Sequence, residues 1–292
     1  MELHQLRYVL AVVDEGTFTA AADAVRISQS GVSAQIAKLE RELGVALLQR
    51  STRRVTPTAA GDHLIPAIRA AVTAVDGIRE TAAEIRGVVA GRLRVGTVGG
   101  LGWPPVFDAL ATLHTAHPGL DISVVEDAAV PLIDRVRDGQ IDLAVAAWTG
   151  DGPVDLQSVT VVDDALSVWV APDHPWAARD GIAPAELADA DVISLPEGSG
   201  ARAALDAVLA GVATRRRPRW EVATPATALA LAVRGLGVAV LSESTGRGTT
   251  GLVAVGVDDP RARSSLGIVW RNDPGPATRA LLDRLLPAAH GS

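Results

Sequence analysis

The segment SQSGVSAQIAKLEREL, residues 28–43, predicts a short amphipathic helix. Apolar residues recur every three to four positions and so share one face: Val32, Ile36, Leu39 and Leu43. Ser28 is a typical N-cap, and Gly44 stands where helices commonly end. The polar side chains are short hydrogen-bonding groups and one cation: Ser28, Gln29, Ser30, Ser33, Gln35 and Lys38.

This polar face has two interpretations. Side chains of these kinds read base edges in a major groove, and the N–H groups at a helix N-terminus bind phosphate. Any surface helix, however, also carries a solvated polar face. The flanking sequence has to distinguish the two.

Two further helices are predicted before this segment. Residues 3–13 show an apolar repeat that ends before Gly16, and residues 17–25 are rich in alanine. Only Arg26 and Ile27 separate the second helix from Ser28. Two short helices joined by a tight turn, the second with a polar start, are typical of a helix-turn-helix.

A two-stranded wing is predicted next, with strands at 47–50 and 54–56 joined by a polar turn at 51–53; Arg53 lies in the turn and Arg54 follows it. An arginine at a wing tip can enter a narrow minor groove. Residues 26–54 hold six basic and two acidic side chains, although the whole chain has a net charge of −7. Such a surface can be merely solvated, but beside a helix-turn-helix it favours DNA. We therefore expect residues 1–57 to form a DNA-binding domain.

Residues 58–90 predict a long linker helix that begins at an N-cap, Thr58. Its apolar stripe includes Leu64, Ile68, Val72, Val75, Ile78, Ala82, Ile85 and Val89. A seam of this kind calls for a partner helix, and we expect the same helix of a second subunit. The alternative is that it packs on its own chain. Pro66 is expected to kink or break the first turns.

Residues 91–292 change to alternating strand and helix patterns, which predicts an α/β domain with a mainly parallel sheet. Two such units in series indicate two lobes with a cleft between them, where small ligands bind. Lobe I is expected over about 91–161 and 267–292, and lobe II over about 162–266. The chain should cross between lobes near residues 161–163 and 264–267.

The order and spacing of several motifs resemble the LysR-type transcriptional regulator family. They are LRYV at 6–9, GTFTAAA at 16–22, ISQSGVS at 27–33, IAKLE at 36–40, LGV at 43–45, LQR at 48–50, TAAG at 58–61 and, more weakly, GLGV at 235–238. The resemblance implies a winged helix-turn-helix, a dimerising linker helix and a two-lobed effector domain like periplasmic binding proteins. It also implies a homodimer or homotetramer, double-stranded DNA with dyad-symmetric sites, and a small-molecule effector.

Carried over to this sequence, the resemblance implies DNA contacts from the residues of the polar face and from Arg53 and Arg54. Arg50 matches a position that is either a phosphate contact or part of a structural ion pair. The chain departs from the family at Gly31, at Ala34 or Gln35 where arginine is frequent, and at Ala59 where glutamate is frequent. The missing arginine puts one base or phosphate contact in doubt.

An effector site is expected at the edge of the cleft. A loop that precedes a predicted helix contains Gly99, Gly100 and Leu101. The free N–H groups of such a loop suit an anion. The alternative is that the loop is only a tight connection between strand and helix. Relatives usually carry serine or threonine in this loop. Four more residues are expected at the site: Trp148, Thr149, Ser199 and Thr224. Trp148 is either an aromatic wall or core packing, and Arg202 is expected to be a solvated surface residue rather than an effector contact.

Several classes of protein are disfavoured. There is no cysteine, no GxSxG motif and no apolar run long enough to span a membrane. His114 and His117 lack neighbouring ligands, so we expect no metal and no cofactor.

Asp163–Asp164 is expected to be a solvated pair. No signal peptide is apparent, so a cytoplasmic location is expected. A cytosolic α/β enzyme, or a ligand-binding module with a helical appendage, remains the rival interpretation of residues 91–292.

Overall fold

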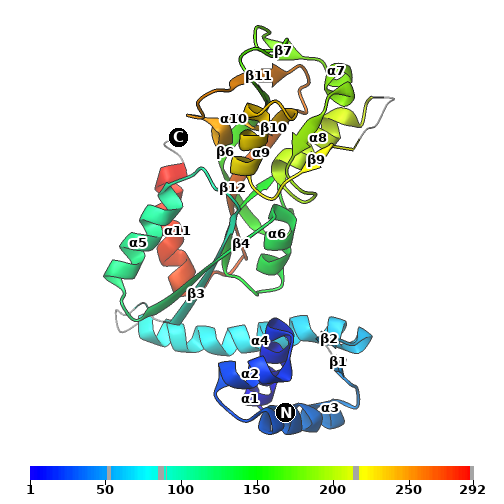
Figure 1. Ribbon diagram of the computed structural model, residues 1–292. Helices are drawn as coiled ribbons and strands as arrows, with labels where there is room; N and C mark the ends of the chain where they lie inside the picture. The colour runs from blue at the N-terminus through cyan, green and yellow to red at the C-terminus, as the bar shows by residue number, and fades with distance from the viewer. Residues whose placement is uncertain (51–53, 85–88, 90, 213–216, 290–292) are drawn as a thin grey trace. The chain divides into compact units, whose positions relative to one another are not determined.

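The computed structural model describes residues 1–292 except 51–53, 85–88, 90, 213–216 and 290–292 (Figure 1). The chain divides into two compact units. The N-terminal unit consists mainly of Met1–Gly87, and the C-terminal unit spans most of Val88–Ser292. No helix among the described residues has the length and apolar character needed to cross a membrane.

The N-terminal unit is the predicted winged helix-turn-helix, followed by the long helix. Its elements are α1 (Leu3–Glu15), α2 (Phe18–Val25), α3 (Gln29–Leu43), β1 (Leu48–Arg50), β2 (Val55–Pro57) and α4 (Ala59–Glu84). Gly16 ends α1 with a positive φ of 73° and accepts a hydrogen bond of 2.8 Å from the Val55 N–H, which fixes the wing against the turn between α1 and α2.

Three of the four apolar residues predicted to share one face of α3 are buried: Val32, Ile36 and Leu39 are fully inaccessible and pack with residues of α1, α2 and α4. The fourth, Leu43 at the end of the helix, is 37% exposed. The stripe of α4 behaves differently. Ile68 and Val72 are buried in this same core, whereas Ile78 is 69% exposed. The expectation that the whole stripe meets a second subunit is therefore wrong for its first half, which packs on its own chain.

Two contacts explain how α4 begins. Thr58 caps the helix by accepting from the Gly61 N–H at 3.0 Å, and its own N–H donates to the Leu47 carbonyl. A Cβ on Gly61 would lie 2.1 Å from the Leu47 oxygen, so only glycine permits this approach. Pro66 does not break the helix, which runs through it as one element. Of the two predicted outcomes the break is wrong, and a kink stays a prediction.

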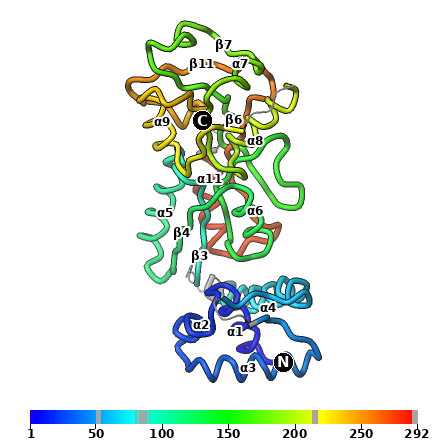
Figure 2. The backbone as a smooth tube through the Cα atoms, turned by 45° about the vertical axis from the view of Figure 1, so that its right-hand side comes forward, coloured from blue at the N-terminus to red at the C-terminus, as the bar shows by residue number. Residues whose placement is uncertain are grey.

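The first lobe of the C-terminal unit has a sheet with helices on both faces. It comprises β3 (Gly91–Val98), α5 (Pro105–Ala116), β4 (Leu120–Asp127), α6 (Ala129–Arg137), β5 (Leu143–Trp148), the start of β6 (Gln157–Val170), the end of β12 (Arg263–Trp270) and α11 (Pro276–Ala289). Helices α5 and α11 lie side by side on one face, and α6 covers the other (Figures 1 and 2).

The second lobe likewise consists of a sheet with helices packed on it, and it contains the C-terminal half of β6. Its remaining elements are β7 (Gly181–Ile182), α7 (Pro184–Asp189), β8 (Val192–Ser194), α8 (Gly200–Leu209), β9 (Trp220–Glu221), α9 (Pro225–Val233), β10 (Val238–Ser242), α10 (Glu243–Gly246) and β11 (Val253–Val257). Short elements without a long apolar period, namely β7, α7, α10 and β11, were not predicted.

Strands β6 and β12 join the two lobes. They pair antiparallel along their length, with a register shift between Leu266 and Gly267, close to the predicted crossings. The sheet order β4-β3-β5-β12-β6-β10-β8-β9 combines parallel outer pairs with antiparallel pairs at its centre. The predicted mainly parallel sheet is thus corrected to a mixed one, because strands that cross between lobes run back along each other.

Candidate nucleic-acid interface and effector cavity

The first turn of α3 presents hydrogen-bonding groups to solvent. Ser28 caps the helix, since its hydroxyl accepts from the Gly31 N–H at 3.1 Å, and it lies 3.2 Å from the Ser30 hydroxyl. Ser28, Gln29 and Ser30 are all exposed. Within the described residues, the Gln29 side chain makes no hydrogen bond. This arrangement places N–H groups and short polar side chains at one accessible helix end.

Further along α3, the predicted polar face is only partly available. Lys38 is exposed and has no ion pair among the described residues, and Ser33 is half-buried. The Gln35 side chain turns toward α1, where its oxygen accepts from the fully buried Gln5 amide at 3.1 Å. This contact orients the Gln35 amide and leaves its NH2 group as a donor, so the assignment of Gln35 to the DNA-facing residues stays a prediction.

The wing is tied to α3 by a carboxylate that sequence reasoning passed over. Glu40 accepts hydrogen bonds from the backbone N–H groups of Leu47 and Leu48, at 2.8 and 3.2 Å. This holds the first wing strand at a fixed place beside the helix. Arg54 is exposed next to Gly16. Arg53 and the Arg50 side chain lie outside the described residues.

A cavity of about 410 Å³ lies between the lobes of the C-terminal unit. Its walls come from the carboxyl ends of strands and the loops that follow them, which is where α/β sheets bind ligands. The lining residues fall in these segments: 98–102, 126–129, 147, 164, 195–196, 199–201, 223–225, 241–242, 244–245, 264 and 266.

Five predicted effector residues line this cavity: Gly99, Gly100, Leu101, Ser199 and Thr224. The two hydroxyl residues are also helix caps. Ser199 accepts from the Arg202 N–H at 3.3 Å, and Thr224 accepts from the Thr227 N–H at the same distance. The glycine loop meets the other lobe, since a Cβ on Gly100 would lie 3.0 Å from Cδ of Pro225. The loop can therefore respond to movement of the second lobe.

Trp148 and Thr149 are not among the lining residues. Trp148 is 8% exposed and packs in the apolar core between α6 and the sheet. Its ring occupies space left by Gly267, where a Cβ would lie 2.2 Å from the indole. The interpretation of Trp148 as an aromatic wall is corrected to core packing, because a glycine more than a hundred residues away provides its slot.

The charge of the cavity wall differs from the expected anion site. Three lining side chains are carboxylates, Glu126, Asp127 and Asp164, and none is basic. Asp127 accepts from the Ala128 N–H at 2.8 Å, at the start of α6, and pairs with Arg135 at 3.1 Å. Asp164 accepts from the Ser244 N–H at 2.9 Å, at the start of α10. The protein's own carboxylates thus occupy these two helix N-termini.

Asp164 also corrects the solvated-pair expectation. Asp163 is exposed and pairs with Arg263, but Asp164 is only 7% exposed. Adjacent residues of a strand point to opposite faces, so the two carboxylates have different surroundings. Recognising β6 as one strand through this point would have separated them.

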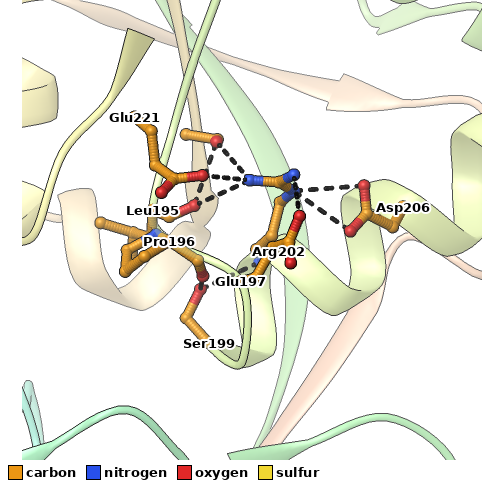
Figure 3. Close-up of polar contacts among 8 residues, drawn as sticks. Leu195, Pro196, Glu197, Ser199, Arg202, Asp206 and Glu221 are labelled. Atoms are coloured by element: carbon orange, nitrogen blue, oxygen red, sulfur yellow. Dashed lines mark hydrogen bonds and ion pairs between the residues drawn. The ribbon is translucent and has the colours of Figure 1, made fainter. Parts of the chain in front are cut away.

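Arg202 is buried rather than solvated, with 6% of its side chain exposed. Figure 3 shows it surrounded by acceptors, with Nη1 2.9 Å from Glu221 and Nε 3.1 Å from Asp206. Burial disfavours the charged guanidinium, but the hydrogen bonds to Glu221 and Asp206 outweigh it and raise the pKa of Arg202. The guanidinium is committed to this cluster and does not reach the cavity.

No group of three or more metal-ligating side chains occurs in the part of the chain that the structure describes. The described residues present two candidate sites: an exposed helix end and wing on the N-terminal unit, and an acidic, partly apolar cavity in the C-terminal unit.

Two protein-family models match the chain. The model described as "Bacterial regulatory helix-turn-helix protein, lysR family" matches residues 3–62, and "LysR substrate binding domain" matches residues 86–289.

Similar proteins carry related descriptions. The chain is 31% identical over 280 residues to a "Probable hydrogen peroxide-inducible genes activator" of Mycobacterium leprae, covering 92% of this chain and 88% of the relative. It is 26% identical to the "DNA-binding transcriptional dual regulator OxyR" of Escherichia coli, covering 99% and 94%. A solved variant of full-length OxyR from Pseudomonas aeruginosa superposes with a TM-score of 0.76 at 27% identity, covering 99% and 95%.

Proposed function

This chain belongs to the LysR family of helix-turn-helix transcriptional regulators, with a substrate-binding domain for a small-molecule effector, and we propose that α3 and the wing read its DNA. The exposed start of α3 carries the proposal. Gln29 and Ser30 contact base edges in a major groove, Ser28 and the free N–H groups contact phosphate, and Lys38 contacts the backbone further along. Arg50, Arg53 and Arg54 extend the interface from the wing.

Residues 1–57, 58–90 and 91–292 are proposed to act as the DNA-binding, linker and effector-binding parts. The first half of α4 is part of the core around α3, while Ile78 on its second half is exposed. That second half is proposed to pair with the same helix of another copy, in a dimer or in a tetramer of two dimers. A two-fold dimer recognises half-sites related by a dyad.

The effector is proposed to bind in the cavity between the lobes and to change their closure. Strands β6 and β12 connect the lobes, so closure bends this antiparallel pair near Leu266 and Gly267. An effector can shift DNA binding only if its affinity differs between two arrangements of the assembly. We propose that closure changes the spacing of the two DNA-binding units in the dimer.

The response to hydrogen peroxide that the relatives' names describe is not proposed for this chain. The sequence contains no cysteine, so no thiolate can be oxidised to a sulfenic acid or a disulfide. Its single methionine is Met1. We expect DNA binding by the full-length protein to be the same before and after treatment with peroxide, and a reversible change would contradict this.

The rival enzyme interpretation is not preferred, because the relatives are regulators and the cavity presents caps and carboxylates. A regulator of this kind is proposed to work in the cytoplasm, where bacterial DNA is found.

Selection from a pool of random duplexes tests the proposed function. Full-length protein is incubated with the pool at moderate salt, and bound duplexes are sequenced over several rounds. The proposal expects enrichment of a motif with dyad symmetry. Weak binding without any enriched motif would contradict it, because phosphate contacts alone carry no sequence information.

A further inference from the structure

Two buried polar side chains face each other across the strands that join the lobes. Asp164 of β6 and Ser264 of β12 are direct partners in the antiparallel register, so their side chains lie on the same face. They are 7% and 3% exposed, and both line the cavity. The pair therefore forms a polar floor to which a ligand has access.

This floor has hydrogen-bonding capacity that the described residues do not use. One oxygen of Asp164, Oδ2, accepts from the Ser244 N–H, and Oδ1 accepts no hydrogen bond among the described residues. The Ser264 hydroxyl likewise has no partner there. A Cβ on Gly200 would lie 2.4 Å from the Ser264 oxygen, so only glycine there lets the start of α8 approach the hydroxyl this closely. Buried polar groups of this kind normally have partners.

The charges around the floor favour a cation. Glu126 and Asp127 line the same cavity, and no arginine or lysine does. Two basic side chains lie nearby: Arg135 pairs with the lining residue Asp127, and Arg263 pairs with Asp163 at 2.9 Å. An additional carboxylate would meet the negative side chains of Glu126 and Asp164, while an ammonium would find opposite charge and free acceptors.

We propose that the effector is a small organic cation whose protonated amine donates hydrogen bonds to Asp164 Oδ1 and Ser264 Oγ. Its body lies against the apolar part of the wall, formed by Leu101, Leu195, Leu241 and Leu266. This inference rests on the proposed function for its regulatory meaning, because it assigns a ligand class to the same cavity.

Calorimetry on the full-length protein tests the ligand class with matched probes. Benzylamine, benzyl alcohol and benzoate share a ring and differ in charge, and agmatine supplies a cation of another shape. At least one of the two cations is expected to bind, and benzylamine more tightly than its neutral and anionic counterparts. Binding of neither cation, or equal or tighter binding of benzoate, overturns the proposal.

Substitutions at the floor give the second measurement. Asp164→Asn keeps an oxygen for the Ser244 N–H and is expected to weaken binding of the cation by about ten- to a hundredfold. Ser264→Ala is expected to weaken it by about two- to tenfold. Asp163→Asn is the matched control, since it removes a carboxylate from the same strand outside the cavity. Unchanged affinity in Asp164→Asn, in a protein with an unaltered thermal transition, also overturns the proposal.

Binding to selected duplexes is measured on the same proteins. Failure of the wild type to bind DNA counts against the proposed function and leaves the calorimetric result intact. Failure of the cations to bind, with sequence-specific DNA binding retained, removes only the ligand class.

Discussion

Helices α3 and α8 begin in the same way and use their polar residues in opposite ways. Each has a serine N-cap, Ser28 or Ser199, whose hydroxyl accepts from an N–H three residues on. In α3 the cation Lys38 is exposed, and no ion pair engages it among the described residues. In α8 the cation Arg202 is buried among carboxylates.

The difference shows what makes a polar helix face available to a partner. Asp206, four residues after Arg202, and Glu221 on a neighbouring strand satisfy the arginine within the protein. In α3 the acid four residues after Lys38 is Glu42, and it pairs with the Met1 amine at 2.6 Å instead. Lys38 and Gln29 therefore remain exposed and available to another molecule. Exposed polar groups that have no partner within the protein are therefore a better indication of an interface than polarity itself.

The largest effect is expected in the apolar core of the C-terminal unit. Trp148→Ala removes a ring that fills the space above Gly267, and should lower the free energy of unfolding of this unit by about 3–5 kcal/mol. Trp220→Ala, at a 37% exposed position, should cost far less. Urea unfolding followed by circular dichroism measures both. Equal losses would show that Trp148 is not a core residue.

Arg202→Ala tests whether the buried cation of α8 stabilises the protein. The substitution removes the hydrogen bonds to Asp206 and Glu221 and should destabilise the protein by about 2 kcal/mol, because the half-exposed carboxylates can recover some hydration. Arg219→Ala breaks an exposed pair with Asp191 and should change stability by less than about 0.5 kcal/mol. If the two variants unfolded alike, Arg202 would be the surface residue first expected.

Lys38→Ala tests whether the exposed cation of α3 binds DNA. Stability should change by less than about 0.5 kcal/mol, while the slope of log affinity against log salt should fall by about one. The measurement is fluorescence anisotropy with a selected duplex over a range of salt concentrations. Arg92→Ala, in the C-terminal unit, serves as the basic-to-alanine control. A slope that stayed the same would remove Lys38 from the phosphate contacts.

The smallest effect on stability is expected at an ion pair on the surface, where both side chains are partly exposed and bind each other. Arg179 donates two hydrogen bonds to Glu186 and holds the pKa of that carboxyl below its usual value of 4.5. The stabilisation is present above pH 4.5 and is lost as the pH falls toward the lowered folded-state pKa. The difference in melting temperature between wild type and Glu186→Gln should therefore shrink as the pH is lowered below 4.5.

Asp189→Asn, an exposed carboxylate on the same helix, is the control for that series. A difference for Glu186→Gln that grew on acidification would reverse the assigned sign.

The parts predicted from the sequence are those set by local patterns. The period of Val32, Ile36 and Leu39 fixes which face of α3 is buried, and Gly16 and Gly44 mark helix ends through their backbone conformation. The glycine loop at Gly99 and Gly100 follows in the same way from a strand that runs into a helix.

The parts that were missed depend on distant residues. Trp148 is a core residue because Gly267 leaves room for it, and the Gln35 amide is oriented by the buried Gln5. Asp164 is buried because β6 continues through both lobes. None of these contacts has a local sequence signal, since each joins segments that only the folded chain brings together.

The central claim is that the start of α3 reads base pairs, and Gln29→Ala tests it most directly. Wild type, Gln29→Ala and the control Gln157→Ala are each titrated against the selected duplex and all its single-base-pair substitutions. The account predicts that Gln29→Ala loses about 1–3 kcal/mol of discrimination at one base pair in each half-site, with other positions unchanged. A uniform loss over all positions, or a loss shared by Gln157→Ala, would contradict it.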